Sequence, residues 1–138
     1  MIIKMKMERW KMGILKSVDC IELYVSDLQE GVDYYSKLGL KVLWKNETSV
    51  GMGMGDDFTE ILLQNERKKM NVDFKVESVI DAVDKIREMG GQIIYGPFDI
   101  PIGKCAVVRD KWSNEYVILD MTKGRYVTDK DGNILDVK

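Results

Sequence analysis

The sequence contains no histidine among its 138 residues. Histidine is the commonest metal ligand in proteins and the usual general base near neutral pH. Acid–base chemistry or metal binding on this chain therefore has to use other side chains. The absence excludes every mechanism that needs an imidazole.

Cysteine is scarce as well, with only Cys20 and Cys105, and two cysteines do not make a disulfide framework at this length. The first eighteen residues scatter five basic side chains among apolar ones. A signal peptide needs an uninterrupted apolar stretch, and this segment has none. We therefore expect reduced thiols in a cytoplasmic protein.

No apolar run approaches the roughly 18 residues that a membrane-spanning helix needs. The formal net charge is −2, with charges of both signs interspersed, which argues against a stripe that binds nucleic acid. We expect neither a membrane nor a nucleic acid as partner. The chain is 45% hydrophobic, which suffices for the core of one domain.

One unit of about forty residues occurs twice in the chain. The stretch VSDLQEGVDYYSKLGLKVL begins at Val25, and VESVIDAVDKIREMGGQII begins at Val76. They align without a gap at a shift of 51 (76 − 25), which places Gly39 on Gly90. Neither copy can bury its own apolar face alone. The repeat therefore predicts two packed modules with a site in the cleft between them.

Each copy shows the same order of strands and helix. Asp27 offers an N-cap oxygen and Gly39 a C-cap to the helix of the first copy. The first copy predicts a strand, a helix and three strands over 17–25, 28–38, 41–47, 48–55 and 58–65. The second copy predicts the same elements over 71–76, 78–89, 92–96, 104–110 and 115–121, with a loop at 96–103. The charged connector ERKK at 66–69 is interpreted as a solvated link.

The sequence after the second copy contains an Asp131-Gly132 turn between two short apolar runs, a strong hairpin signal. The predicted fold class is α+β: two βαβββ modules followed by a C-terminal β-hairpin. We expect a leader over 1–18, one domain over 19–122 with modules 19–65 and 70–122, and the hairpin over 123–138. The leader is interpreted as loosely held, a mis-assigned start being an alternative. A further alternative is an arm that docks on a partner chain.

Three phrases now form a family pattern: CIELYVSDLQEGVDYYSKLGLKV, its echo DFKVESVIDAVDKIREMGGQI, and the closing segment GPFDIPIGKCAVVRDKWSNEYVILD. Over about residues 18–122 the chain resembles the glyoxalase / bleomycin-resistance / extradiol dioxygenase superfamily, also called vicinal oxygen chelate proteins. The resemblance implies that each module curls into a half-barrel and that the pair encloses a cleft. It also implies a homodimer, because family folds of this length commonly pair.

Metal ligands in the family's enzymes occupy four inward positions, on the first and last strands of each module, and are usually histidine, glutamine or glutamate. The resemblance carries these positions over to Cys20, Glu60, Asn71 and Val117. Val117 cannot bind a metal, Asn71 is a weak ligand, and Cys20 ligates strongly only as a thiolate. We therefore expect no metal and no other cofactor.

Two of these residues have alternative interpretations. If Glu60 points into the cleft, it acts as a general base with a raised pKa, or anchors a cationic or hydrogen-bonding ligand. A register slip of one residue would instead turn Glu60 to water and leave Thr59 and Ile61 inward. Cys20 is expected to be a small buried side chain rather than a nucleophile, since no histidine is available to activate it.

The remaining candidates are apolar or aromatic. Met52 and Met54 lie two apart on a predicted strand and share a face. They either shape a pocket for varied ligands or pack in the core. Trp112 either stacks on a flat ligand, plugs a hinge or contacts a partner subunit. The predicted ligand-binding set is Cys20, Glu60, Asn71, Met52, Met54, Trp112 and Val117.

The expected function is metal-independent binding of a small organic molecule, in the manner of the family's drug-binding resistance proteins. Such binding needs shape and a few polar anchors. The alternative is a lyase, isomerase or dioxygenase of the same superfamily that uses Glu60, with or without a divalent metal. A third possibility is a regulatory or structural module whose cleft is vestigial.

Overall fold

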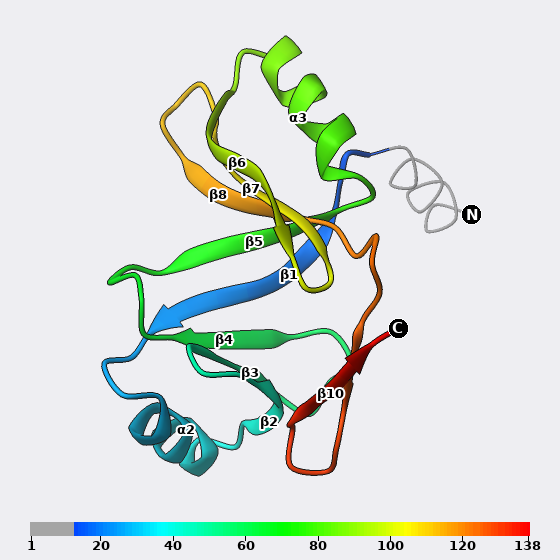
Figure 1. Ribbon diagram of the computed structural model, residues 1–138. Helices are drawn as coiled ribbons and strands as arrows, with labels where there is room; N and C mark the ends of the chain where they lie inside the picture. The colour runs from blue at the N-terminus through cyan, green and yellow to red at the C-terminus, as the bar shows by residue number, and fades with distance from the viewer. Residues whose placement is uncertain (1–12) are drawn as a thin grey trace, which may run out of the picture. The chain divides into compact units, whose positions relative to one another are not determined.

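The computed structural model describes residues 13–138, which form two compact units (Figure 1). The Glu60 unit contains residues 19–73 and 123–138, and the Asp120 unit contains residues 13–18 together with residues 74–122. Two strands, β1 (Leu15–Tyr24) and β5 (Asn71–Val76), each continue from one unit into the other.

The Glu60 unit is built on the first module. After β1 come α2 (Leu28–Lys37), β2 (Lys41–Lys45), β3 (Ser49–Gly53) and β4 (Glu60–Gln64), and the sheet order is β2-β3-β4-β1. Strands β1 and β4 run parallel, with Ile21 opposite Ile61 and Leu23 opposite Leu63. The other neighbours in this order are antiparallel.

Alternation along the strands separates a core face from a polar face. One face packs beneath α2, with Val50, Met52, Ile61 and Leu63 fully or nearly buried. Because successive side chains of a strand point to opposite faces, Cys20, Glu22 and Glu60 lie on the other side of the sheet. The residues that pack on this core from β1 and α2 are Ile21, Leu23, Leu28, Val32 and Tyr35.

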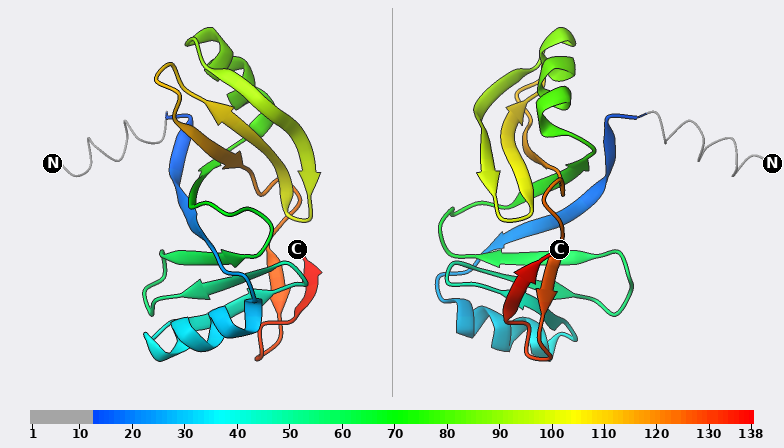
Figure 2. Two further views of the ribbon diagram at one scale, coloured as in Figure 1. Left: turned by 90° about the vertical axis from the view of Figure 1, so that its left-hand side faces the viewer. Right: turned by 45° about the vertical axis from the view of Figure 1, so that its right-hand side comes forward.

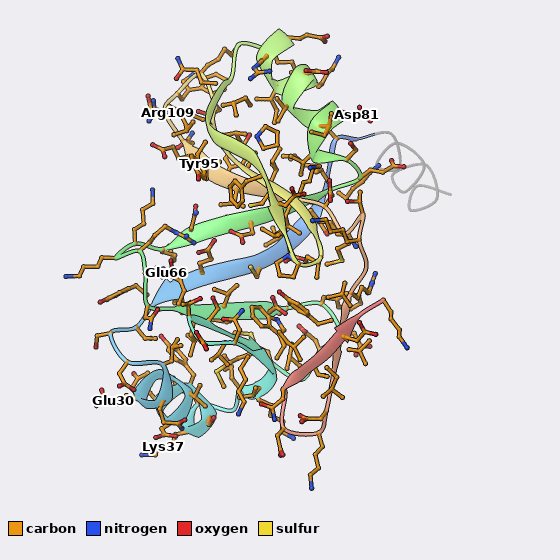
Figure 3. All side chains as sticks on the ribbon, in the orientation of Figure 1. Glu30, Lys37, Glu66, Asp81, Tyr95 and Arg109 are labelled. Carbon is orange, nitrogen blue, oxygen red and sulfur yellow. The ribbon has the colours of Figure 1, made fainter. Side chains whose placement is uncertain are left out.

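The ends of α2 agree with the sequence prediction. The Asp27 side chain accepts a hydrogen bond from the Glu30 amide at 2.9 Å, which satisfies a free N–H of the first turn. Gly39 follows the helix with φ of 102°, a conformation that favours glycine. Figure 3 shows Glu30 and Lys37 at opposite ends of the helix, where their charges complement the helix dipole.

The Asp120 unit repeats this order. It contains β5, α3 (Val79–Glu88), β6 (Gln92–Ile100), β7 (Gly103–Arg109) and β8 (Glu115–Leu119), with the sheet order β5-β8-β7-β6. Gly90 ends α3 with φ of 89°, as Gly39 ends α2. The prediction of two βαβββ modules is therefore confirmed. The core of this unit gathers Val76, Val79, Ala82, Val83, Ala106, Val108 and Ile118.

The predicted loop at 96–103 is wrong, because β6 continues to Ile100 and pairs with β7 through Phe98 and Cys105. Proline cannot donate a hydrogen bond to a neighbouring strand. Pro97 is tolerated because it falls at a register irregularity between Tyr95 and Phe98, where the regular pairing is interrupted.

The C-terminal hairpin is formed by β9 (Tyr126–Thr128) and β10 (Ile134–Val137), as predicted. Its loop is longer than the Asp131-Gly132 pair: the Asp129 carboxylate accepts from the amides of Asp131 and Asn133, both at 2.9 Å. The Lys45 amide donates to the Gly132 carbonyl at 2.9 Å, so the hairpin lies beside β2 (Figure 2).

The predicted leader falls mostly on residues 1–12, which lie outside the described part of the chain. Residues 15–18, also assigned to the leader, belong to β1. The division into leader, domain and hairpin stays a prediction, since the compact units group the hairpin with the first module. Within residues 13–138, both helices are too short or too polar to cross a membrane.

Candidate ligand site around Glu60

Three side chains that can bind a cation meet on the polar face of the Glu60 unit. The carboxylates of Asp19 and Glu60 and the Cys20 thiol each place one ligand atom within 4.8 Å of the others. Strands β1 and β4 create this arrangement, because the pairing of Ile21 with Ile61 sets Cys20 beside Glu60. Two of the sequence-predicted site residues, Cys20 and Glu60, therefore lie together.

Glu60 lies on the face of β4 opposite the core residues Ile61 and Leu63. Of the two registers left open by the sequence, the structure has the one in which Glu60 is partly buried among polar groups. Burial raises the pKa of Glu60 to about 7; a hydrogen bond from Trp44 lowers it somewhat, and the Asp19 charge raises it. A carboxyl group with this pKa exchanges protons near neutral pH.

Trp44 holds Glu60 by a hydrogen bond from its indole Nε1 to Oε1 at 3.0 Å. Gly51 makes room for the indole: a Cβ at that position would lie 2.1 Å from the Trp44 Nε1 atom. On the hairpin, the Tyr126 ring lies 5.2 Å from the Trp44 ring between centroids. Burial and the charge of Glu60 both raise the pKa of Tyr126.

Cys20 is almost fully buried, and its thiol donates a hydrogen bond to Asp73 Oδ2 at 3.4 Å. Burial first, and then the charges of Asp73, Asp19 and Glu60, raise the pKa of the thiol far above its usual range. A protonated thiol is a poor nucleophile. The geometry thus describes a buried polar thiol rather than a reactive one.

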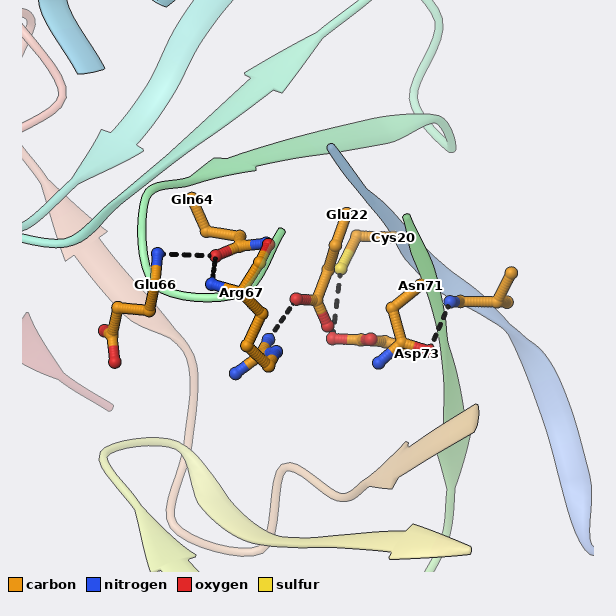
Figure 4. Close-up of polar contacts among 8 residues, drawn as sticks. Cys20, Glu22, Gln64, Glu66, Arg67, Asn71 and Asp73 are labelled. Atoms are coloured by element: carbon orange, nitrogen blue, oxygen red, sulfur yellow. Dashed lines mark hydrogen bonds and ion pairs between the residues drawn. The ribbon is translucent and has the colours of Figure 1, made fainter. Parts of the chain in front are cut away.

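A second carboxyl pair lies next to Cys20 (Figure 4). Glu22 and Asp73 are only 2% and 6% exposed. Burial raises the pKa of Asp73, and the contact with Glu22 raises it further. Two carboxyl groups in contact repel each other when both are ionised, so the pair favours holding a proton.

Arg67 forms an ion pair with Glu22, and buried Gln64 fixes the turn that presents it (Figure 4). The Gln64 Oε1 atom accepts from the amides of Glu66 and Arg67 at 2.8 and 2.7 Å. The interpretation of residues 66–69 as a purely solvated link is therefore wrong. One of its cations is needed to neutralise a buried carboxylate.

Asp73 also has an unsatisfied acceptor. Within the described part of the chain, its Oδ1 atom is buried and lacks a hydrogen-bond partner. An unpaired buried carboxylate oxygen costs free energy, and in native proteins such atoms call for an explanation. A bound donor or cation at the cluster would supply one.

The other predicted residues of this unit are placed differently. Met52 is fully buried in the core beneath α2, on the face opposite Glu60. Met54 lies beyond the end of β3 and is 52% exposed, so the prediction that both methionines share a strand face is wrong. Asn71 is buried, and its Oδ1 atom accepts from the Val72 amide at 3.1 Å.

Two predicted residues belong to the Asp120 unit. Val117 packs with Cys105 and Leu119 in a small apolar cluster. Trp112 is 75% exposed in the loop before β8, and the Lys111 ammonium lies 5.2 Å from its ring centroid. The predicted role of each in ligand binding stays a prediction.

Several residues of the site were missed by the sequence analysis. The shift of 51 that aligns Cys20 with Asn71 also aligns Glu22 with Asp73, and this was a usable signal for the buried acid pair. Asp19 gave no such signal, because neighbours in a strand point to opposite faces. The missed residues are Asp19, Glu22, Trp44, Arg67, Asp73 and Tyr126.

The expectation of no metal depended on counting only Cys20 and Glu60 as usable donors. That count is wrong, since Asp19 supplies a third ligand atom. Two carboxylates and a thiol are a donor set that Zn²⁺ and similar divalent ions accept. The three residues fit such an ion, which would act as a Lewis acid when bound. Cys20 would join as a thiolate, after losing its proton.

Two βαβββ modules in one chain, with polar groups gathered on one strand face of the Glu60 unit, define the class of the fold. The sequence profile of the Glyoxalase/Bleomycin resistance protein/Dioxygenase superfamily matches residues 17–137, and the chain belongs to this superfamily. No protein with a curated description matches it by sequence.

Solved structures share the fold at low identity. Methylmalonyl-CoA epimerase from Mycobacterium tuberculosis has a TM-score of 0.67 at 10% identity, over 79% of this chain and 90% of that one. Methylmalonyl-CoA epimerase from Streptomyces coelicolor has a TM-score of 0.66 at 14% identity, over 78% of this chain and 96% of that one. Homoprotocatechuate 2,3-dioxygenase from Brevibacterium fuscum has a TM-score of 0.59 at 24% identity, over 79% of this chain and 37% of that one. At these identities the likeness concerns the fold alone.

Proposed function

We propose that the chain binds a small organic molecule at Glu60, and that this binding does not require a metal ion. The observation that supports this proposal most is the hydrogen bonding of the Glu60 carboxylate. Among the described residues, only the Trp44 indole donates a hydrogen bond to this partly buried carboxylate. Its second oxygen remains available as an acceptor, so Glu60 suits the role of a polar anchor.

A thermal-shift screen of a compound library, with and without divalent metals, tests this function, because a ligand that binds only the native state raises the melting temperature. Each hit is then titrated into the wild type and Glu60→Gln. A hydrogen bond to a charged anchor is worth about ten- to a hundred-fold in affinity, and we expect that loss in Glu60→Gln. Glu47→Gln, which changes an exposed glutamate of the same unit, is the matched control.

Equal affinity of wild type and Glu60→Gln for every hit would contradict the proposal. A screen without any hit would favour a module whose binding function has been lost. That the ligand lies in a cleft between the two repeats stays a prediction.

A second candidate is a metal-assisted lyase, isomerase or dioxygenase. It is favoured by the third donor, Asp19, and by the pKa of Glu60 near 7, which suits a general base at neutral pH. The test loads the protein with Zn²⁺, Mn²⁺ or Fe²⁺. It then measures deuterium uptake from D₂O into acyl-CoA thioesters and oxygen consumption with 3,4-dihydroxyphenylacetate. Activity that requires the ion and disappears in Asp19→Asn would favour this candidate.

The proposed setting of this function is a homodimer in a reducing cytoplasm. Both cysteines are buried thiols, and neither belongs to a disulfide. A reducing compartment suits such thiols. Fractionation of the native cells with an antibody against the chain would test the compartment.

A further inference from the structure

The strongest unexplained feature of the Glu60 unit is an excess of buried acceptors near Glu60. The Cys20 thiol donates a hydrogen bond to Asp73 and also lies within 4.8 Å of a Glu60 oxygen. Within residues 13–138, Asp73 Oδ1 lacks a partner although the side chain is only 6% exposed. A group that brings positive charge or N–H donors would stabilise this arrangement.

A pair of aromatic side chains adjoins the same carboxylate through Trp44. The Trp44 indole donates to Glu60, and the Tyr126 ring lies 5.2 Å from the Trp44 ring at an interplanar angle of 42°. The C-terminal hairpin supplies Tyr126, and the hydrogen bond from Lys45 to Gly132 holds that hairpin beside β2. A carboxylate next to aromatic rings is a combination that recognises organic cations.

We infer that the Glu60 site takes a small organic cation, an alkyl- or arylammonium, held by the Glu60 carboxylate and by Trp44 and Tyr126. This inference rests on the proposed function and names its ligand class. It also makes the C-terminal hairpin part of the site, because Tyr126 lies on β9 of that hairpin.

The aromatic pair is what favours an organic cation over a bare metal ion. A divalent ion needs the oxygen and sulfur ligands of Asp19, Cys20 and Glu60 and gains nothing specific from Tyr126. An arylammonium uses Glu60 through its N–H donors and the ring faces through cation–π attraction. Both ligands would need Glu60, so Tyr126 is the residue that distinguishes them.

Isothermal titration with four probes of similar size tests the inference: benzylamine, phenyltrimethylammonium, benzyl alcohol and benzoate. We expect benzylamine to bind best, benzyl alcohol weakly and benzoate not at all. Glu60→Gln should weaken benzylamine about ten- to a hundred-fold. Tyr126→Leu should weaken phenyltrimethylammonium about two- to thirty-fold, the usual range of a cation–π contact.

Matched variants keep the test interpretable. Tyr126→Phe retains the ring and should bind as the wild type does, even if Tyr126→Leu fails to fold. Phe58→Leu removes an aromatic ring that is 86% exposed on the same unit and should leave binding unchanged.

Three results would overturn the inference. Benzyl alcohol or benzoate binding as tightly as benzylamine, with a loss in Glu60→Gln, would leave the proposed function intact but exclude a cation as its ligand. Stoichiometric binding of Zn²⁺ together with no binding of either ammonium probe would assign the acidic groups to a metal instead. Affinity of all four probes that is independent of Glu60 would contradict the inference and the proposed function together.

Discussion

At the scale of single residues, the polar face of the Glu60 unit combines buried acids with few compensating groups. Arg67 neutralises Glu22, and Trp44 supplies one hydrogen bond to Glu60. Burial raises the pKa values of Glu60 and Asp73 because an ionised carboxylate loses hydration inside the protein. This unit therefore retains a local destabilisation, which is typical of binding and catalytic sites rather than of structural cores.

The stability of the protein should depend on pH through Glu60. A carboxyl group whose pKa is raised on folding, here from 4.5 to about 7, stabilises the folded state when protonated. Its contribution is full at pH values below 4.5 and is lost as the pH rises through about 7. Glu60→Gln cannot ionise, so its free energy of unfolding relative to wild type should increase by about 1–3 kcal/mol between pH 4.5 and pH 8.

Urea denaturation at these two pH values measures the effect, and the exposed-site variant Glu47→Gln is the control. A constant difference between Glu60→Gln and wild type at both pH values would show that Glu60 is not desolvated in the folded protein.

Gly51 is required by the indole of Trp44. Gly51→Ala would place a methyl group 2.1 Å from Trp44 Nε1, and the indole would have to leave Glu60. We expect a loss of about 1–3 kcal/mol in the free energy of unfolding and a shift of the tryptophan fluorescence maximum. Gly53→Ala is the matched control on the same strand, since the atoms nearest its methyl would be those of the flexible Leu43 side chain, at 3.2 Å. Equal effects of the two substitutions would contradict this account.

At the scale of elements, the sequence determines helices and turns more reliably than strand ends. Asp27 and Ser78 cap the two helices as N-cap residues do, and Gly39 and Gly90 follow them. The end of β6 was not predictable, because Gly96-Pro97 is a common turn signal. The tertiary pairing of Phe98 with Cys105 overrides that local preference.

Asp120 joins α3, β7 and the loop after β8 in its unit. Its carboxylate accepts from the Val79 amide at the start of α3 at 2.8 Å, from the Lys104 amide of β7 at 2.9 Å and from the Thr122 hydroxyl at 2.8 Å. Burial alone would raise the pKa of Asp120, but the hydrogen bonds, those from Val79 and Lys104 above all, hold it below its usual value. The carboxylate is therefore needed in its ionised form.

Asp120→Asn should destabilise the protein by about 2–4 kcal/mol at pH 7, because an amide has one acceptor oxygen where the carboxylate has two. Since the pKa of Asp120 is lowered on folding, its stabilisation is full above the unfolded value and is lost as the pH falls through the folded one. The deficit of the variant should therefore shrink in strong acid. Thermal unfolding at pH 7 and pH 3 measures this, with the exposed Asp33→Asn as control; a deficit that persists in acid would contradict it.

At the scale of the whole molecule, the gapless repeat was enough to predict the βαβββ order of both modules. It did not predict which residues gather at the site. Cys20 and Glu60 were found by resemblance, but Asp19 was not, because a regular strand would turn it away from Cys20. Tyr126 was missed because the repeat contains no counterpart of the hairpin. A site residue supplied by an added element leaves no periodic signal.

The chain should form a homodimer. Half-barrel modules leave unpaired strand edges, which proteins commonly cover by pairing with a second copy. Sedimentation velocity at micromolar concentration should give twice the mass of 15.9 kDa, and dilution should shift it toward the monomer. A monomer mass at every concentration up to the millimolar range would contradict this expectation.

The metal content of the purified protein distinguishes the two candidate functions. Binding an ion through Asp19, Cys20 and Glu60 requires the buried Cys20 thiol to ionise, although burial and neighbouring charges raise its pKa far above the usual range. A metal must supply that free energy from its own binding. Under the leading proposal, elemental analysis of protein purified without added metal should show well under one ion per chain. One Zn²⁺, Mn²⁺ or Fe²⁺ per chain, retained through dialysis and lost in both Cys20→Ser and Glu60→Gln, would instead favour the metal-assisted enzyme.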